Sequence, residues 1–299
     1  MAISTIIGVD VGGTKIQAGL ITRDGYILKR FKVPTEAKKG RATVMKNITH
    51  CIDAVKAPGM RAIGVGLAGI VDYRKGIYLQ GPNFPTSFKN VPIAAILKRT
   101  YGVPVTIDND VHCFTLAEAI FGQGKGKSTI VGVTLGTGIG GGIVIDGRLY
   151  RGRNNAAGEL GHMTILSDAN TRCSCGQFGH LEALASGSAM SRLYATATGN
   201  LVDAHAVEKA ADSGDKNARA VLAKMSKALA LGLTNIIHIL NPDIITVGGG
   251  LIRVKALWNP MLTEVKKLTI YPVLRTTPIV RSKLGDDANL IGASLLTKK

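Results

Sequence analysis

Cysteine, acidic residues and aromatic residues are all scarce in this chain of 299 residues. Four cysteines are too few for a disulfide framework at this size, which argues against a small disulfide-stabilised secreted protein. No uninterrupted apolar run reaches the roughly 18 residues that a membrane-spanning helix needs. The first residues also lack the basic segment and cleavage site of a secretory signal. We therefore expect a cytoplasmic protein with no membrane partner.

The scarcity of acidic residues leaves a strongly basic chain. Its 37 Lys and Arg residues outnumber its 20 Asp and Glu residues, which gives a formal net charge of +17. The excess is spread over both halves of the chain and forms no basic tail, and basic residues rarely alternate with aromatic ones. This distribution favours a basic, solvated surface over a nucleic-acid interface, although an anionic substrate is also compatible with it.

Apolar residues and glycine, in contrast, are abundant, and one part of the sequence is repeated. Apolar residues make up 45% of the chain, enough for a sizeable core. Residues 6–14 (IIGVDVGGT) resemble residues 130–138 (IVGVTLGTG), and each segment is followed by an apolar run and an Asp-Gly pair. Each copy therefore predicts strand, glycine-rich turn, strand, Asp-Gly turn, strand. Apolar strands resemble one another by chance, but the shared order of the turns favours an internal duplication.

Helical patterns follow each copy. Apolar spacing and capping residues predict helices over residues 42–56, 91–99, 111–121, 215–240 and 289–296. Residues 244–247 predict a short buried strand. Strands that alternate with helices indicate an α/β fold, and the two copies indicate two similar domains with a cleft between them.

The first glycine-rich turn carries a charged motif, Asp10-Val-Gly-Gly-Thr-Lys15. Gly12 and Gly13 would let backbone N–H groups approach phosphate oxygens, and Thr14 adds a hydroxyl group. Asp10 stands at the end of the strand, where its carboxylate can hold Mg²⁺, usually through water. A hairpin turn with no ligand is the plain alternative.

Two further glycine-rich segments suit the same kind of ligand. Residues 136–142 (GTGIGGG) repeat the first turn in the second copy, and two facing turns would clamp one polyphosphate chain. Residues 248–250 (GGG) follow a short apolar strand, and close approach of a nucleotide base and ribose would explain three successive glycines. A loop without a ligand is the alternative.

Asp108-Asn109-Asp110 stand just before a predicted helix. Asn and Asp at such a position usually cap the helix. A carboxylate at this place can also accept a proton from a substrate hydroxyl group. The residues by themselves leave both functions open.

One short segment combines histidine and cysteine. His162, Cys173, Cys175 and His180 follow the pattern His-x10-Cys-x-Cys-x4-His. This pattern supplies four nitrogen and sulfur donors on one loop and suits tetrahedral zinc. A disulfide between the two cysteines would be strained, since only one residue separates them.

Taken in order, these elements resemble the ROK family of sugar kinases and repressors over nearly the whole chain. The matching segments are residues 10–15, 81–85 (GPNFP), 109–110, 118 with 121–124 (FGQG), 136–138, 159–162 (ELGH) and 173–182, the most specific of them. The resemblance implies the actin-like ATPase, ribonuclease H-like fold, an internally duplicated α/β fold with a cleft between two lobes. It implies a smaller N-terminal lobe of residues 1–117 with 287–299, and a larger C-terminal lobe of residues 118–286 that carries the zinc loop.

For function, the resemblance implies phosphoryl transfer from ATP to the 6-hydroxyl group of a hexose, with glucose as the first choice. Asp110 would be the catalytic residue that accepts the proton of this hydroxyl group. The residues that would bind the sugar are Gly69, Asn83, Asn109, Asp110, Glu159, His162 and Glu182. The residues that would bind ATP and Mg²⁺ are Asp10, Gly12, Gly13, Thr14, Lys15, Gly136, Thr137, Gly138, Gly249 and Gly250.

The chain departs from the family pattern in its zinc loop. The family usually has a third cysteine where this chain has His180. Since histidine also binds zinc, we expect a structural site of two histidines and two cysteines: His162, Cys173, Cys175 and His180. His162 would then use one ring nitrogen on zinc and the other on the sugar.

Several other functions stay open. An N-acetylhexosamine kinase, a broad-specificity hexose kinase, a polyphosphate-dependent glucokinase and a non-catalytic sugar-sensing protein are the alternatives. The repressors of the family carry an N-terminal helix-turn-helix domain, whereas this sequence begins at the first strand, so we expect no nucleic-acid partner. Because family members are commonly dimers or tetramers, we expect a homodimer or homotetramer.

Overall fold

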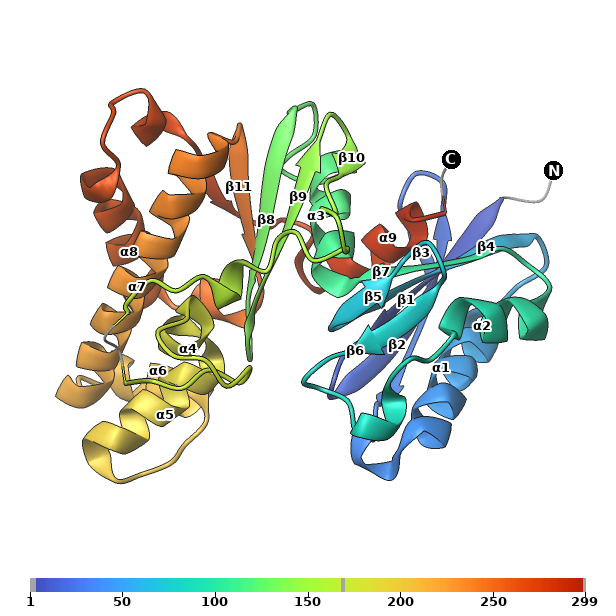
Figure 1. The fold of residues 1–299 in the computed structure, drawn as a ribbon, viewed down its shortest axis with the longest axis horizontal. Coiled ribbons are helices and arrows are strands. Elements are labelled where there is room, and N and C mark those ends of the chain that lie inside the picture. The colour runs from blue at the N-terminus through green and yellow to red at the C-terminus, as the bar shows by residue number, and fades with distance from the viewer. Residues whose placement is uncertain (1–3, 168–169, 298–299) are drawn as a thin grey trace. The chain divides into compact units, whose positions relative to one another are not determined.

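The chain folds into two compact units, each with its own hydrophobic core (Figure 1). The structure is a computed structural model that describes residues 4–167 and 170–297. Unit 1 comprises Met1–Gly126, Gly142–Ala157 and Lys283–Lys299, and unit 2 comprises Lys127–Gly141 and Gly158–Ser282. The lobe boundaries and the cleft that the sequence predicts stay predictions.

The first five-stranded sheet has the strand order β3-β2-β1-β4-β7. Its strands are β1 (Thr5–Val11), β2 (Lys15–Thr22), β3 (Ile27–Pro34), β4 (Met60–Leu67) and β7 (Val105–Asn109). β1 pairs antiparallel with β2 and parallel with β4, and β4 pairs parallel with β7. Because the carboxyl ends of parallel strands meet at one edge of a sheet, Asp10 and Asn109 both arrive at that edge.

Helices and a small sheet complete unit 1. The helices are α1 (Arg41–Val55), α2 (Ile93–Tyr101), α3 (Asp110–Ile120) and α9 (Ala288–Leu295), and the small sheet pairs β5 (Ile70–Asp72) with β6 (Ile77–Gln80). α1 packs on β2 and β3, whereas α9 packs on β1, β4 and α3. The last helix of the described chain therefore covers its first strand, and it brings residues near 289 to the end of β1.

The second five-stranded sheet repeats the order of the first, as β10-β9-β8-β11-β12. Its strands are β8 (Thr129–Leu135), β9 (Ile139–Ile145), β10 (Arg148–Leu149), β11 (Ile244–Gly248) and β12 (Ile279–Arg281). β11 pairs parallel with both β8 and β12, as β4 does with β1 and β7. The α/β fold and the internal duplication are therefore confirmed.

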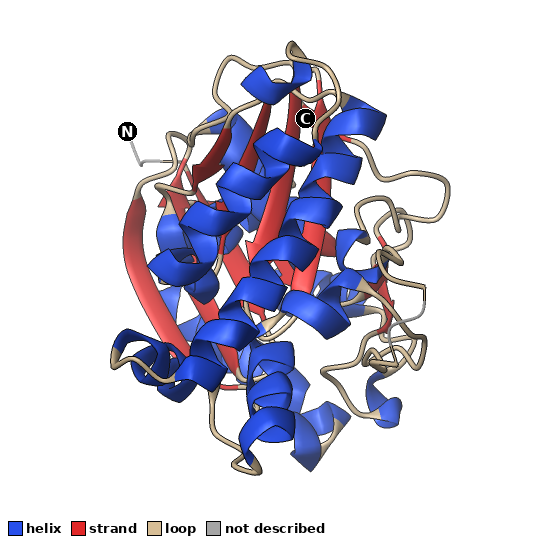
Figure 2. Cartoon of the chain, turned by 90° about the vertical axis from the view of Figure 1, so that its left-hand side faces the viewer, coloured by secondary structure: helices blue, strands red, loops and turns tan. Residues whose placement is uncertain are grey.

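Helices pack over the strands of unit 2 (Figure 2). They are α4 (Leu181–Ala185), α5 (Gly187–Thr198), α6 (Ala204–Asp212), α7 (Lys216–Leu240) and α8 (Lys255–Leu268). α7 is long and apolar enough to cross a membrane by length and composition, but 67% of its most apolar window is buried. Its buried residues, among them Leu229 and Leu233, belong to the core of unit 2, which explains their apolar character.

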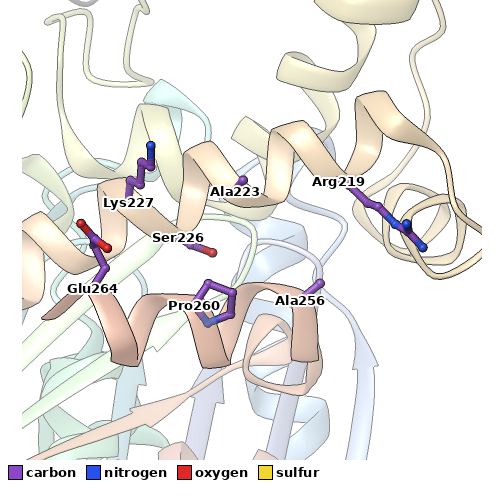
Figure 3. Close-up of a pocket in the computed structure, with 7 residues that line it drawn as sticks. All are labelled: Arg219, Ala223, Ser226, Lys227, Ala256, Pro260 and Glu264. Carbon is purple, nitrogen blue, oxygen red and sulfur yellow. The ribbon is translucent and has the colours of Figure 1, made fainter. Parts of the chain in front are cut away.

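A hollow of about 350 Å³ lies along α7 and α8 (Figure 3). Its lining residues are Arg219, Ala223, Ser226, Lys227, Ala256, Pro260 and Glu264. The Ser226 hydroxyl donates to the carbonyl of Leu257 (3.0 Å) and joins the two helices. The site residues predicted from the sequence are not among those that line this hollow.

The helices predicted from the sequence agree with α1, α2, α3, α7 and α9 to within two residues at either end. α4, α5, α6 and α8 were not predicted. α4 spans only 5 residues, and α8 contains Pro260 in its interior, where proline normally ends a helix. Packing against α7 stabilises both, and this contact is invisible in their local sequence.

Candidate active site

The first glycine-rich turn joins β1 to β2 and is braced by Thr35. The N–H group of Gly12 donates to the carbonyl of Lys15 (3.0 Å), which closes the turn. The hydroxyl and N–H groups of Thr35 donate to the carbonyls of Gly12 (2.6 Å) and Thr14 (2.9 Å). The side chains of Thr14 and Lys15 are exposed. The turn is therefore a fixed frame that solvent and a ligand can reach.

Asp10 lies at the end of β1 and is buried. The amide of Gln17 donates to its Oδ2 (3.1 Å), and the amide of Asn289 donates to its Oδ1 (3.4 Å). Burial raises the pKa of Asp10 above its ordinary value, although both amides favour the charged form. A nearby cation would therefore stabilise the ionised carboxylate.

Asn109 caps α3, and this part of the capping prediction is confirmed. Its Oδ1 accepts from the N–H groups of Val111 (2.8 Å) and His112 (3.1 Å). Its Nδ2 donates to the carbonyl of Gly69 (3.1 Å). Both ends of the amide are thus occupied, which fixes the orientation of the side chain.

Asp110 is the first residue of α3 and lies partly buried. Loss of hydration raises the pKa of Asp110 to about 7, and the carboxylate of Asp10 adds to this effect. A carboxyl group with a pKa near neutrality can take up and release a proton at physiological pH. Asp110 therefore has the property that a general base needs.

Unit 1 also contains Asn83 and Gly69, two further residues that the sequence predicts for the sugar site. A Cβ atom built on Gly13 would lie 2.8 Å from the Cβ of Asn83, so the turn and Asn83 are in direct contact. The side chain of Asn83 is exposed. Gly69 has φ +130°, where side chains are disfavoured, and its carbonyl holds Asn109.

The second glycine-rich turn joins β8 to β9 and is held by the start of α5. The N–H groups of Gly187 and Ser188 donate to the carbonyls of Gly136 (2.8 Å) and Thr137 (3.2 Å). The N–H group of Gly136 donates to the carbonyl of Gly138 (3.0 Å). The helix terminus therefore supports this turn as Thr35 supports the first.

Glu182, on α4, joins the second turn to the cysteine loop. Its Oε2 accepts from the N–H group of Ile139 (3.1 Å), and its Oε1 accepts from the hydroxyl of Ser174 (2.7 Å). A Cβ atom built on Gly138 would lie 2.5 Å from Oε2. One carboxylate thus contacts both segments.

The four predicted metal ligands converge in unit 2. The ligand atoms of His162, Cys173, Cys175 and His180 all lie within 4.8 Å of one another. Nδ1 of His162 lies 3.4 Å from Nδ1 of His180 and 3.7 Å from the Sγ of Cys173, and the Sγ of Cys175 lies 3.3 Å from Nδ1 of His180. A tetrahedral site with bonds of about 2.0 to 2.3 Å separates its ligands by roughly 3.3 to 3.8 Å. The three distances given above fall within that range.

Glu159 and His162 lie at the two ends of one helical turn that contains residues 160–162. Nε2 of His162 lies 3.8 Å from the Oε2 of Glu159, while its Nδ1 faces the metal-ligand cluster. The side chain of Glu159 is exposed. The imidazole ring thus directs Nδ1 toward the metal-ligand cluster and Nε2 toward the carboxylate of Glu159.

The third glycine-rich segment follows β11. Gly249 has φ +89°, and a Cβ atom there would overlap the carbonyl of Leu135. Packing against β8 therefore explains Gly249 without a ligand. A Cβ atom on Gly250 meets only open space, so packing does not require this glycine. That both contact a nucleotide stays a prediction.

Sequence reasoning missed the side chains that hold the predicted residues in place. Gln17 and Asn289 bind Asp10, and Asn289 is 279 residues away from it, a distance that left no signal. His112 binds Asp108. These two residues are four positions apart at the start of a predicted helix, and this spacing is a signal that could have found the pair.

Comparison with known proteins gives a consistent result. A model described as the ROK family matches residues 6–299. The chain is 36% identical to the glucokinase of Thermotoga maritima over 98% of the chain and 97% of that protein. It is 32% identical to the N-acetyl-D-glucosamine kinase of Escherichia coli O6:H1 (strain CFT073), with 97% and 98% covered.

Comparison of the fold with solved structures gives the same result. The solved structure of a ROK family glucokinase from Streptomyces griseus, in complex with glucose and AMPPNP, matches with a TM-score of 0.85. The identity is 30%, and 98% of both chains is covered. The resemblance inferred from the sequence, and the fold that it implies, are confirmed.

Proposed function

We propose, from the premise that this chain belongs to the ROK family, that it is a sugar kinase that transfers the γ-phosphoryl group of ATP to the 6-hydroxyl group of a hexose. The single observation that carries the proposal is Asp110, a partly buried carboxyl group at a helix start whose pKa is raised to about 7. A group of this kind suits proton transfer from a sugar hydroxyl group.

Asp110 is the catalytic residue of the proposed reaction. Its ionised carboxylate orients the 6-hydroxyl group and takes its proton as the bond between O6 and phosphorus forms. The bond between phosphorus and the β,γ-bridging oxygen breaks, and ADP leaves with the electron pair. Asn109, whose amide is fixed at both ends, binds the sugar beside Asp110.

The two glycine-rich turns bind the phosphates of ATP in this proposal. Their frames are supported by Thr35 and by the start of α5, so little order is lost when a ligand binds. The buried carboxyl group of Asp10 fits Mg²⁺, because a cation offsets the burial that raises its pKa. When bound, Mg²⁺ would neutralise phosphate charge. The proposed nucleotide-binding residues are Asp10, Gly12, Gly13, Thr14, Lys15, Gly136, Thr137, Gly138, Gly249 and Gly250.

Glucose is the proposed sugar, and it would be bound by Gly69, Asn83, Asn109, Asp110, Glu159, His162 and Glu182. The similarity to a glucokinase at 36% identity supports this choice. The similarity to an N-acetyl-D-glucosamine kinase at 32% supports N-acetylglucosamine as a second candidate. Both carboxylate oxygens of Glu182 already accept hydrogen bonds, so its sugar contact would use its remaining lone pairs.

Zinc is the proposed metal of the His162, Cys173, Cys175 and His180 cluster. Two nitrogen and two sulfur donors that all lie within 4.8 Å of one another fit this ion. When bound, zinc would supply a structural cross-link to the loop. The loop also carries Ser174, whose hydroxyl group donates to the carboxylate of Glu182. We further propose a cytoplasmic homodimer or homotetramer, as the family resemblance implies.

A panel of hexoses with ATP and Mg²⁺, measured as kcat/KM, tests the proposal. The highest value for glucose supports it, and a higher value for N-acetylglucosamine replaces the proposed sugar. A parallel assay with polyphosphate in place of ATP decides the phosphoryl donor. Glucose binding without turnover on any donor would contradict the proposal and favour a sugar-sensing protein.

A further inference from the structure

A buried ionic cluster lies beside the Asn109–Asp110 segment, and its residues contact neither ATP nor sugar in the reaction proposed above. Asp108, the residue before Asn109, is fully buried. Its Oδ1 accepts from Nδ1 of His112 (2.8 Å), and its Oδ2 accepts from Nε of Arg151 (2.7 Å). The amide of Asn155 also donates to Oδ1 (3.2 Å). Three side chains from two segments thus surround one carboxylate.

The surroundings of His112 define its protonation state. Its side chain is buried, with Nδ1 facing the carboxylate of Asp108 and Nε2 facing the carbonyl of Ala157 (3.0 Å). An ionised carboxylate and a carbonyl only accept hydrogen bonds, so both ring nitrogens must carry a proton. Charged groups face the ring from β7 (Asp108), from its own helix (Asp110) and from the segment after β10 (Arg151).

The balance of these groups favours the cation. Burial by itself lowers the pKa of His112, and so does the positive charge of Arg151. The hydrogen bond to Asp108, the negative charge of Asp108 and the hydrogen bond to Ala157 together outweigh both and raise the pKa of His112 above its ordinary value. The same pairing lowers the pKa of Asp108, although its burial acts in the opposite direction.

The cluster joins segments that are far apart in the sequence. Ala157 is the last residue of unit 1 before the chain enters unit 2. Arg151 lies over the ring of Tyr73 at 4.3 Å, and Asn155 donates to the carbonyl of Val71 (2.9 Å). Asp108 also accepts from the N–H group of Asn109 (2.8 Å). The cluster therefore holds the backbone just before the proposed catalytic residue.

We propose that His112 is a positioning residue, a buried imidazolium that ties Asp108 to the carbonyl of Ala157 and thereby fixes Asn109 and Asp110. Its charge strengthens both hydrogen bonds, as it does wherever one partner is ionised. It also favours the ionised form of Asp110, against the burial of that carboxyl group. The catalytic part of the inference rests on the proposed function, in which Asp110 accepts the proton.

Two substitutions of His112 distinguish the hydrogen bond made by Nδ1 from the one made by Nε2. In His112→Asn the amide nitrogen takes the place of Nδ1 and can still reach Asp108, whereas in His112→Gln it takes the place of Nε2 and can still reach Ala157. Both variants lose the charge. We expect kcat to fall by up to about a hundredfold, the loss typical of a small misplacement of reacting groups, while KM for ATP stays unchanged. The exposed His205, paired with Glu208 on α6, supplies the control His205→Asn, which should leave kcat unchanged.

The protonation state is measured without any assay of activity. At about one pH unit above the ordinary pKa of histidine, ¹⁵N NMR of the wild-type ring should show both nitrogens of His112 protonated. A neutral His112 ring at that pH overturns the inference, and so does an unchanged kcat in both folded variants.

The proposed function and the inference about His112 can be contradicted independently of each other. If the wild-type protein phosphorylates no hexose, the proposed function fails, whereas the ring signals still decide the charge of His112. Shifted amide signals of Asn109 and Asp110 in His112→Gln then support positioning, and unshifted ones overturn it. If His112→Asn does not fold, the kinetics of His112→Gln and the ring signals of the wild type still test the inference.

Discussion

The β1–β2 turn of unit 1 and the β8–β9 turn of unit 2 are copies of one strand–turn–strand segment, and they differ in the origin of their carboxylate. In the first copy Asp10 belongs to the strand itself. Thr134 stands at the equivalent position of the second copy. There the carboxylate next to the turn comes from Glu182 on α4, which binds the N–H group of Ile139.

The hydrogen bonds that support the two turns also come from different kinds of segment. Thr35 braces the first turn through one side chain and one N–H group, whereas the start of α5 braces the second through two N–H groups. Each turn nevertheless contacts a residue proposed for the sugar, Asn83 in unit 1 and Glu182 in unit 2. The backbone frame is thus duplicated, while the side chains that give each copy its chemistry are its own.

The largest expected effect concerns Asp110, the proposed proton acceptor, which lies in unit 1. Asp110→Asn should leave sugar binding largely intact and lower kcat by about 10²- to 10⁴-fold, the range typical for a lost general base. Steady-state kinetics and sugar binding measure the two effects. Asp24→Asn, on the exposed turn between β2 and β3, is the control. A turnover close to that of the wild type would show that Asp110 is not the base.

The second prediction concerns the proposed zinc of the His162, Cys173, Cys175 and His180 cluster, which lies in unit 2. Removal of zinc with a chelator should loosen the loop from His162 to Glu182, because the cross-link between its four ligands is lost. Hydrogen exchange should then rise over residues 159–186 and stay unchanged in the β1–β2 turn, which serves as the internal control. Metal analysis that finds no zinc in the pure protein, or an equal rise in both turns, would contradict this.

The third prediction uses glycines within one turn as a matched pair. In Gly138→Ala the new methyl group would lie 2.5 Å from the Oε2 of Glu182, whereas in Gly136→Ala it would meet open space. Overpacking of this kind costs about 1–3 kcal/mol, so we expect KM for the sugar to rise roughly tenfold in Gly138→Ala. Gly136→Ala should leave it nearly unchanged. Equal effects of the two substitutions would argue against a contact between Glu182 and the turn that matters for binding.

The smallest expected effect is a pH dependence of stability. The pKa of Asp110 is about 7 in the folded protein and near 3.8 without its surroundings. Between these values the folded protein binds more protons than the unfolded chain, so the free energy of unfolding falls as pH rises through this window. Asp110→Asn removes this loss and should be more stable than the wild type at pH values above the window. Urea unfolding at the two ends of the window measures the difference, which should vanish at the acidic end.

The sequence predicts the parts of the site whose members are neighbours along the chain. The strand–turn–strand copies, the cap at Asn109 and the ligand spacing from His162 to His180 all depend on local pattern, and the structure contains each of them. The contacts that hold these parts are different. Nothing near Glu182 in the sequence indicates that its carboxylate reaches Ile139, and α8 has a proline where its local pattern would end a helix.

By itself, the sequence determined the α/β class, the duplication and the identity of the metal-ligand cluster, since each follows from the spacing of apolar residues, glycines or donor atoms. Only the tertiary structure decided how these groups behave. Asn289 reaches Asp10 because α9 packs on β1. His112 is flanked by two acceptors because the segment after β10 brings Ala157 to it. The raised pKa of Asp110 has the same origin, because burial and the approach of a second carboxylate exist only in the folded chain.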